Sequence, residues 1–331
     1  MNNKISTPAD LYEVVNLFRT SRIILTAYEL DFFSIIGKGK KTSTEISGML
    51  RTDERATDRL LNALVVIGLI KKSGNKYSNS QLAGKFLVKS SPTYMSGISH
   101  IVNLWDSWDT LTNAVKAGTS IFNRGAINER GEDWIEAFIA AMHSRGGSHA
   151  REILSLLNFD KVKTIIDIGG GSGAFLFEFI KKNKELKGVI YDLPNVVPLT
   201  EKYIFKEGLN NSVATIPGNY LTDELGSEYD MAFLSAVIHS NSPSENQLLF
   251  KKCYDSLNSG GQIIILDYVM DETRTSPGTG AFFSINMLVG TEKGDTYTQK
   301  EIKDWLTSAG FKKIKFKKTT LETSLMIGHK I

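Results

Sequence analysis

The sequence predicts an α/β protein whose second part is a doubly wound, mostly parallel sheet. Three observations lead to this prediction. Strand-like apolar runs alternate with helix-like segments after about residue 160, and a glycine-rich turn follows the first of these runs. The first 120 residues, in contrast, have the patterns of helices. With 331 residues, 41% of them hydrophobic, the chain is long enough for two folded domains.

In the first half, a helix is expected from about Ala9 to Ile36, and Thr42–Glu45 has the pattern of a capped helix start. Asp53 or Thr57 begins the next helix, and Leu69–Tyr77 has the pattern of a short hairpin. The apolar face of that helix is expected to hold Leu60, Leu64 and Ile67. Helix, helix and hairpin, in this order, are typical of a winged helix-turn-helix.

In the second half, five strands are expected in a parallel sheet, at Thr164–Ile168, Val189–Tyr191, Val213–Ile216, Met231–Ser235 and Ile263–Leu266. Helices are expected at Phe175–Lys182, Val196–Glu207, Glu245–Leu257 and Thr298–Ala309. The runs Lys313–Lys317 and Ser324–His329 predict an antiparallel hairpin at the edge of the sheet. We expect the domain boundary near Arg145–Ser148, with a helical domain over 1–145 and the sheet domain over 146–331.

Composition excludes several classes of protein. The 39 Lys and Arg nearly balance the 36 Asp and Glu, so we expect no nucleic-acid partner. Apolar runs such as Ile263–Leu266 are too short to cross a bilayer, so we expect no membrane partner. The N-terminus lacks a secretory apolar stretch, so we expect no export. Cys253 is the single cysteine, which excludes an internal disulfide framework and fits a cytoplasmic protein.

The glycine-rich turn, Asp167–Gly173, is the strongest local signal for a ligand. Glycines at a strand-to-helix turn let the backbone approach a ligand closely, and the helix N-terminus offers free N–H groups. Asp192 ends the next predicted strand, where a carboxylate can accept both ribose hydroxyl hydrogens of an adenosine. The expected contacts from this turn are Gly169, Gly170, Gly171 and Gly173.

The same glycines also satisfy the Rossmann dinucleotide pattern, so the turn alone does not identify the nucleotide. Two features favour S-adenosylmethionine. Asp167 can help to hold the positively charged methionine end, and Asn219 and Tyr220 can place an amide and a ring against adenine. The antiparallel closure of the sheet also suits a methyltransferase better than a dehydrogenase.

Motifs along nearly the whole chain resemble the S-adenosylmethionine-dependent O-methyltransferases typified by plant caffeic acid and hydroxyindole O-methyltransferases, with bacterial small-molecule members. The motifs are Arg22–Leu30, Phe138–Met142, Asp167–Gly173 and Tyr191–Pro194. The resemblance implies a class I methyltransferase domain behind a winged-helix dimerisation domain, and hence a homodimer. It further implies that Leu193 and Ser235 contact the cofactor and that S-adenosylhomocysteine is the product.

The segment Leu234–His239 is similar to the part of this family that carries its catalytic histidine. The resemblance implies that His239 is a general base that deprotonates the hydroxyl of a small aromatic acceptor, with Asp267 as its carboxylate partner. No set of residues has the spacing of metal ligands, so no metal is expected. The expected acceptor pocket is lined by Phe138, Met142, Asn286 and Met287, within a wider set that includes Trp105, Trp108, Phe282 and Phe283. The family match favours Met142, Asn286 and Met287 among them.

The chain departs from the family pattern at three places. Ser240 and Asn241 replace the Asp-Trp that usually follows the histidine, and Thr296 stands where a second catalytic acid is usual. Asp295 is one residue away and is the expected substitute for that acid. Asn219 and Ser235 replace an Asp and a Lys that hold adenine in plant members.

These departures leave two other functions open. The chain could be a C-methyltransferase or a member of the group that has lost methyl transfer. A DNA-binding regulator built on the winged helix is the third hypothesis, which rests on Arg51, Arg55 and Arg59. Acidic residues interleave with these arginines, so a solvated charged face explains them more simply.

Overall fold

The computed structural model describes residues 5–122 and 131–331 and divides the chain into two compact units, Met1–Val102 and Asn103–Ile331. The boundary expected near Arg145 falls instead inside helix α8 (Glu132–Ile153), which packs against α9 (Ala174–Lys182). Gly146 explains the difference, because a Cβ there would lie 2.7 Å from the Cβ of Ala174. The glycine that suggests a linker is therefore a site of close helix packing.

The first unit begins with two helices where the sequence predicts one. Helix α1 (Pro8–Glu29) ends just before Asp31, whose φ of 58° starts α2 (Phe32–Ile36) in a new direction. Asp is one of the few residues that adopt this left-handed conformation readily. Helix α3 (Ser43–Leu50) begins as predicted, since Thr42 and Glu45 form a reciprocal capping box.

Helix α4 (Glu54–Ile67) is capped by Asp53 and buries Thr57, Leu61 and Leu64. Its core face is thus rotated from the predicted one, because Leu60 and Ile67 are only half-buried. The predicted hairpin is present as β2 (Ile70–Ser73) and β3 (Lys76–Asn79), which pair with β1 (Lys41–Thr42) in the order β1-β3-β2. Helix α5 (Gln81–Phe86) follows, and the winged-helix interpretation of this unit stays a prediction.

The second unit contains the predicted sheet, and the α/β fold class is confirmed. Its strand order is β11-β12-β8-β7-β4-β5-β6, and among neighbouring strands only the pairs that involve β12 are antiparallel. The strands are β4 (Thr164–Ile168), β5 (Lys187–Asp192), β6 (Val213–Pro217), β7 (Tyr229–Ser235), β8 (Leu257–Asp267), β11 (Lys312–Lys318) and β12 (Ser324–His329).

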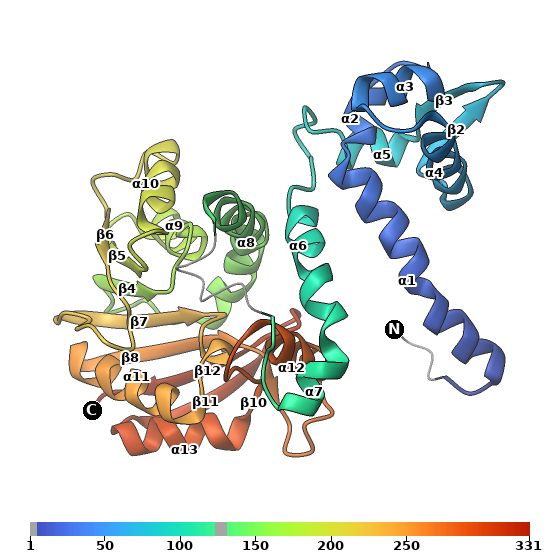
Figure 1. The fold of residues 1–331 in the computed structure, drawn as a ribbon. Helices are drawn as coiled ribbons and strands as arrows, with labels where there is room; N and C mark the ends of the chain where they lie inside the picture. Colours follow the sequence, from blue (N-terminus) through green and yellow to red (C-terminus); the bar gives the residue numbers. More distant parts are fainter. Residues whose placement is uncertain (1–4, 123–130) are drawn as a thin grey trace. The chain divides into compact units, whose positions relative to one another are not determined.

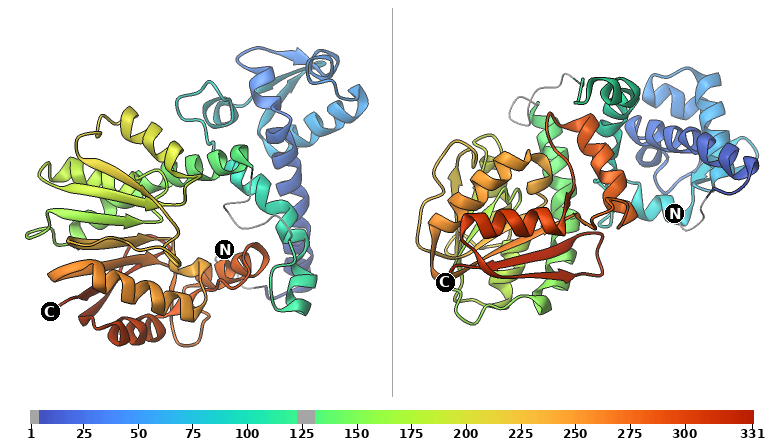
Figure 2. Two further views of the ribbon diagram at one scale, coloured as in Figure 1. Left: turned by 60° about the vertical axis from the view of Figure 1, so that its left-hand side comes forward. Right: turned by 90° about the horizontal axis from the view of Figure 1, so that it is seen from below.

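Helices cover both faces of this sheet (Figures 1 and 2). Helices α9 and α10 (Val197–Lys206) lie on one face, and α11 (Pro243–Ser256) and α13 (Gln299–Ala309) lie on the other. Successive strand residues point to opposite faces, so Ile165 belongs to the core under α9, and Ile166 belongs to the core under α11 and α13. This double burial accounts for the continuous apolar runs of the strands.

The strand order reverses beside β4, since β5 and β6 follow on one side and β7 and β8 on the other. Ligands of open α/β sheets bind at such a switch point, outside the carboxyl ends of the strands. Several elements that the sequence analysis does not single out lie in this unit. They are α7 (Leu111–Ala117), α12 (Gly278–Gly290) and the paired strands β9 (Val269–Met270) and β10 (Tyr297–Thr298).

Candidate functional site

The glycine-rich turn joins β4 to α9 and is tightly packed. Gly173 caps α9 with a φ of 78°, and a Cβ there would lie 2.4 Å from Ile190. A Cβ on Gly170 would lie 2.7 Å from the carboxyl carbon of Asp167. These two positions therefore require glycine. Within the turn, the N–H of Gly173 donates to the carbonyl of Gly170 at 2.9 Å.

Asp192 ends β5 beside this turn. One carboxylate oxygen accepts the N–H of Gly171 at 2.7 Å, and the other accepts the N–H of Leu193 at 2.7 Å. Burial raises the pKa of Asp192 to about 6, against the lowering effect of these two donors. The carboxylate is thus held in one orientation, with lone pairs left for a ligand.

Asp167 is 2% exposed, and no described residue donates a hydrogen bond to its carboxyl group. Burial, and to a lesser extent the charge of Asp192, raise its pKa to about 8. A buried carboxyl group with no protein cation beside it favours a ligand that brings a positive charge.

A cavity of 310 Å³ lies beside Asp192, lined by Leu193, Pro194, Asn195, Asn219 and Asp223. The Asn219 N–H donates to the Asp223 carboxylate at 2.9 Å, which fixes the turn after β6. Tyr220 lies next in the chain, and its hydroxyl donates to Oδ1 of Asn241 at 3.0 Å. Ser235 is half-buried at the end of β7, the strand beside β4. The structure thus places Leu193 and Asn219 at one cavity.

His239 and Asp267 meet at the carboxyl ends of β7 and β8. His239 lies in the 3-10 turn Ile238–Ser240, and its Nδ1 is 2.8 Å from Oδ1 of Asp267. The same oxygen accepts the N–H of Tyr268 at 2.8 Å. A carboxylate accepts hydrogen bonds only, so Nδ1 carries the hydrogen and Nε2 is left with a lone pair. The pair is buried, with exposed fractions of 8% for His239 and 1% for Asp267.

The Asp295 carboxylate does not reach the imidazole. The Asp295 N–H donates to the carbonyl of His239 at 3.0 Å, while its carboxylate accepts the N–H of Thr296 at 2.7 Å and lies 3.4 Å from Arg274. Thr296 is buried, and its hydroxyl donates to the carbonyl of Gly280 at 3.4 Å. Asp295 therefore contacts His239 through backbone atoms.

An aromatic side chain of helix α12 packs against His239. Phe283 meets the His239 ring edge-on, with centroids 4.8 Å apart, and stacks on Tyr268 at 4.2 Å. Met287 is buried one turn further along, and Asn286 accepts the indole N–H of Trp108 at 3.0 Å. Phe282, in contrast, is 66% exposed.

Three other residues expected at the acceptor are each half-buried: Phe138 and Met142 of α8, and Trp105 of α6 (Ile98–Asp109). His143 of α8 contacts the glycine turn, because its Nδ1 lies 2.9 Å from the hydroxyl of Ser172. It also stacks on Tyr203 at 4.2 Å. Ser172 is the residue of the turn that His143 contacts. The sequence analysis does not identify it, because a serine between glycines gives no signal of such a contact.

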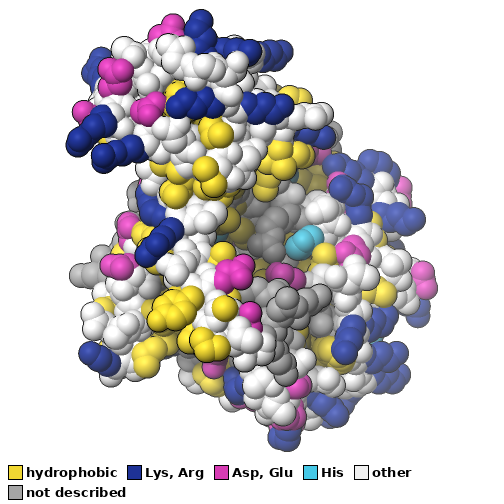
Figure 3. Space-filling model, turned by 90° about the vertical axis from the view of Figure 1, so that its right-hand side faces the viewer, with side chains coloured by type: hydrophobic (Ala, Val, Ile, Leu, Met, Phe, Trp, Pro, Cys, Tyr) yellow, Lys and Arg dark blue, Asp and Glu magenta, His cyan; other side chains and the backbone are white. Residues whose placement is uncertain are grey.

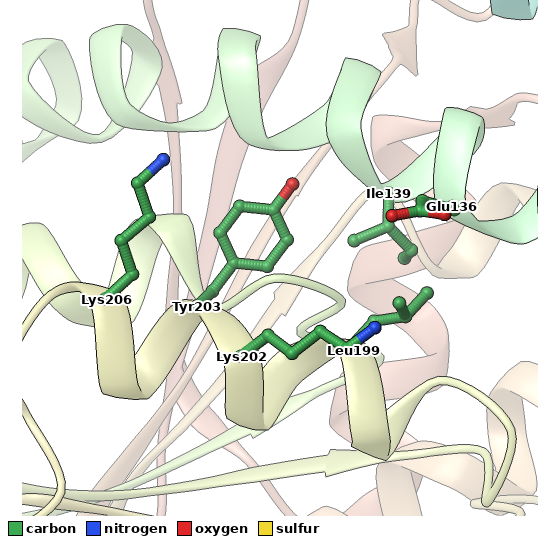
Figure 4. A pocket seen from close by; sticks show the side chains of 6 residues that line it. All are labelled: Glu136, Ile139, Leu199, Lys202, Tyr203 and Lys206. Atoms are coloured by element: carbon green, nitrogen blue, oxygen red, sulfur yellow. The ribbon is translucent and has the colours of Figure 1, made fainter.

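A second cavity, of 230 Å³, lies between α8 and α10 (Figure 4). Its lining consists of Glu136, Ile139, Leu199, Lys202, Tyr203 and Lys206. Ile139 also approaches the glycine turn, since a Cβ on Gly171 would lie 3.3 Å from it. One residue of this cavity, Ile139, therefore also borders the glycine turn.

In the part of the chain that the structure describes, no three His, Cys, Asp or Glu side chains are grouped as metal ligands. Within the same residues, every helix is too short or too polar to span a membrane.

The doubly wound sheet with its antiparallel edge strand has the fold of a class I methyltransferase, and such sheets bind their ligands at the switch point. The O-methyltransferase domain model matches residues 108–312, and the O-methyltransferase dimerisation domain model matches residues 12–89. The chain belongs to the S-adenosylmethionine-dependent O-methyltransferase family, as the sequence motifs predict.

Relatives and solved structures agree with this assignment. A 3-hydroxy-5-methyl-1-naphthoate 3-O-methyltransferase of Streptomyces sahachiroi is 28% identical over 302 residues, which cover 89% of this chain and 87% of the relative. Acetylserotonin O-methyltransferase of Gallus gallus is 26% identical over 340 residues, which cover 98% of this chain and 97% of the relative. The crystal structure of human N-acetylserotonin methyltransferase in complex with SAM has a TM-score of 0.84 at 24% identity, covering 100% of this chain and 99% of that one, and it supports the fold.

Proposed function

We propose that this enzyme transfers a methyl group from S-adenosylmethionine to a hydroxyl of a small aromatic acceptor, with His239 as the general base. The observation that carries the proposal is the bond between His239 and Asp267, which leaves Nε2 as the lone-pair nitrogen. The reaction produces S-adenosylhomocysteine.

The residues at the switch point suit the cofactor. Asp167 is a buried carboxyl group without a described donor, and it would bind the amino group of the methionine portion. Asp192 would accept the ribose hydroxyls, and Leu193, Asn219 and Tyr220 would contact adenine. When bound, S-adenosylmethionine supplies an electrophilic methyl group on a positively charged sulfur.

His239 would make the acceptor oxygen a better nucleophile. A phenol with a pKa of about 10 is almost entirely neutral at pH 7. Nε2 would take the hydroxyl proton as the oxygen attacks, a role that contributes roughly 10²- to 10⁴-fold to a rate. Asp267 would fix the tautomer of the ring and stabilise the imidazolium that forms.

We assign Asp295 a positioning role in place of the catalytic role expected from the sequence. Its backbone N–H holds the carbonyl of His239, while its side chain is 48% exposed beside Arg274. The acceptor would lie against Phe283 and Met287 of α12 and against Phe138 and Met142 of α8.

We further propose that the enzyme is a homodimer that pairs through its N-terminal unit. Large apolar side chains are exposed along α1, among them Tyr12 at 72%, Val15 at 53% and Phe18 at 55%. Exposed apolar side chains are also visible in the space-filling view (Figure 3). An apolar stripe of this kind marks an interaction surface. A cytoplasmic location is proposed on the single cysteine.

The test is to incubate the purified enzyme with S-adenosylmethionine and a panel of phenols, and to identify the products by mass spectrometry and NMR. O-methylated phenol together with S-adenosylhomocysteine is the expected result. A product methylated on carbon, or no transfer to any acceptor, would favour the two alternatives that keep the cofactor. A salt-sensitive shift of duplex DNA would favour the regulator.

A further inference from the structure

A chain of hydrogen bonds joins the loop after β6 to the turn that carries His239. The hydroxyl of Tyr220 donates to Oδ1 of Asn241 at 3.0 Å, and Nδ2 of Asn241 donates to Oδ1 of Asn246 at 3.0 Å. Nδ2 of Asn246 donates in turn to the backbone carbonyl of Ile238 at 2.9 Å. Ile238 directly precedes His239, so the chain of bonds ends on the backbone of the histidine turn.

The carbonyl of Ile238 fixes the direction of every bond in this chain. A carbonyl oxygen only accepts, so Asn246 must turn its NH₂ group to Ile238 and its amide oxygen to Asn241. Asn241 then offers its own NH₂ group to Asn246, and its amide oxygen accepts the hydroxyl of Tyr220. Both asparagines are buried, and because an unpaired buried amide is costly, neither amide turns over freely.

Backbone contacts of Asn241 hold the same turn. Its N–H donates to the carbonyl of Ile238 at 3.3 Å, and its own carbonyl accepts the hydroxyl of Tyr297, which lies on β10. The carbonyl of His239 accepts the N–H of Asp295 at 3.0 Å. The backbone that carries the imidazole is therefore fixed by neighbouring segments, and Asn241 takes part in two of these bonds.

The other end of the chain of bonds is fixed from α11. Nζ of Lys252 donates at 3.1, 3.1 and 2.9 Å to the backbone carbonyls of Tyr220, Leu221 and Asp223. An ammonium group has three hydrogens, so all of them are used on this loop. Asn246 lies on the same helix and reaches the histidine turn. Helix α11 therefore connects the loop at the proposed cofactor site with the turn at the proposed acceptor site.

We propose that Asn241 and Asn246 are positioning residues that couple the adenine side of the cofactor site to the general base. When Tyr220 lies against adenine, its hydroxyl keeps the two amides in the orientation that fixes the backbone of His239. The coupling is reciprocal, so a loosened histidine turn weakens cofactor binding as well. This inference rests on the proposed function, since it takes adenine to lie at Tyr220 and His239 to be the base.

The first experiment measures how well His239 acts as a base in variants of the chain of bonds. The acceptors are phenol, which is neutral at pH 7, and pentafluorophenol, which its fluorine atoms keep ionised. The measured quantity is the ratio of the kcat for phenol to the kcat for pentafluorophenol, because only phenol needs a base. A protein that is merely destabilised loses both activities equally, and its ratio does not change.

Two single variants remove bonds at the two ends. Asn246→Leu keeps a branched side chain but removes both hydrogen bonds of the amide, and Tyr220→Phe removes the hydroxyl but keeps the ring. We expect the ratio to fall about 3- to 10-fold in each variant, the range of one net hydrogen bond. Gln247→Ala is the matched control with an unchanged ratio, since Gln247 is the next residue of α11 and is exposed. An unchanged ratio in both single variants overturns the proposal.

The double variant Tyr220→Phe/Asn246→Leu tests whether the bonds act as one chain. Without Asn246 the amide of Asn241 is no longer held, so loss of the Tyr220 hydroxyl should have little further effect. We therefore expect the double variant to have about the ratio of Asn246→Leu alone. Effects that multiply in the double variant overturn the proposal. If Asn246→Leu does not fold, an unchanged ratio in Tyr220→Phe overturns it instead.

The affinity for S-adenosylhomocysteine, measured by calorimetry without an acceptor, distinguishes failure of the inference from failure of the proposed function. Asn246→Leu should weaken this binding about 3- to 10-fold, and Tyr220→Phe should add little to the loss in the double variant. This result supports the coupling even if the wild type methylates neither phenol. Methylation of both phenols by the wild type, with an affinity and a ratio that Asn246→Leu leaves unchanged, overturns the coupling alone.

Discussion

Nδ1 of His239 and Oδ1 of Asp267 are 2.8 Å apart, although 28 residues separate them in the chain. The pairing of β7 with β8 brings them together, because parallel neighbours end at the same edge of the sheet. The carboxylate oxygen also accepts the N–H of Tyr268, so its position is fixed before any acceptor binds.

Asp267→Asn should therefore disable the histidine while keeping the shape of the site. An Asn side chain can turn its NH₂ group to Nδ1, which moves the ring hydrogen to Nε2 and removes the base. We expect kcat to fall roughly 10²-fold or more, within the range of general-base catalysis. Cofactor affinity, measured by calorimetry, is the control and should stay the same. A variant with wild-type kcat would contradict the role of Asp267.

Cofactor binding should release a proton at pH 7. Burial raises the pKa of Asp167 to about 8, so this carboxyl group is largely protonated in the free enzyme, and a cationic amino group would ionise it. Calorimetry in buffers with different ionisation enthalpies measures the protons released. Asp167→Asn should bind the cofactor more weakly and release fewer protons. Equal proton release by the variant and the wild type would exclude Asp167 as the amino-group ligand.

The same groups give the free enzyme a pH-dependent stability. The pKa values of Asp167 and Asp192 in the folded state, about 8 and about 6, lie above the ordinary value of 3.8. The folded state then binds more protons than the unfolded state between about pH 4 and pH 8. The stability that these two groups contribute is therefore fully present below pH 4. It is lost as the pH rises to 8, so the free energy of unfolding decreases over this range. Urea unfolding across this range should show a smaller pH dependence in Asp167→Asn.

Gly170→Ala should damage the cofactor site and the fold together. The added methyl group would lie 2.7 Å from the carboxyl carbon of Asp167 and 3.1 Å from Ile190, which overpacks the turn. We expect a loss of about 1–3 kcal/mol in the free energy of unfolding and weaker cofactor binding. Gly48→Ala is the matched control, since nothing lies within 4 Å of its Cβ, and it should stabilise α3 by about 0.5–1 kcal/mol. Equal unfolding midpoints for the two variants would be evidence against tight packing of the turn.

The proposed homodimer interface on α1 predicts which substitutions should give a monomer. Replacing both Val15 and Phe18 by Glu places charge on exposed apolar positions of this helix, and we expect monomers in sedimentation velocity. Phe205→Glu is the control, since this residue is 77% exposed on α10 of the second unit. If the double variant sediments as the wild type does, α1 is not the interface.

Local patterns predict much of the fold. Alternating strands and helices indicate the parallel sheet, and the capping pattern of Thr42 and Glu45 predicts the start of α3. The errors lie where contacts distant in sequence decide the outcome. Gly146 resembles a linker residue but lies at close contact with Ala174, and the core face of α4 is rotated so that Leu61 is buried.

The site follows the same division. The glycine turn and Asp192 are predicted from the residues, because each lies at the end of a recognisable strand, and the His239–Asp267 pair is what the family resemblance implies. The environment of Asp295 is not predicted, because the choice between His239 and Arg274 as a partner depends on how the loop after α12 folds back. The hydrogen bond from Trp108 to Asn286 is likewise not predicted, because 178 residues separate the two in the chain.

The central claim is that His239 deprotonates the acceptor, and His239→Ala tests it most directly with two acceptors. One is a phenol of ordinary pKa, and the other is a phenol whose electron-withdrawing groups keep it ionised at pH 7. We predict a loss in kcat of roughly 10²- to 10⁴-fold for the first and a much smaller loss for the second, which needs no base. Equal losses for the two phenols would contradict the claim.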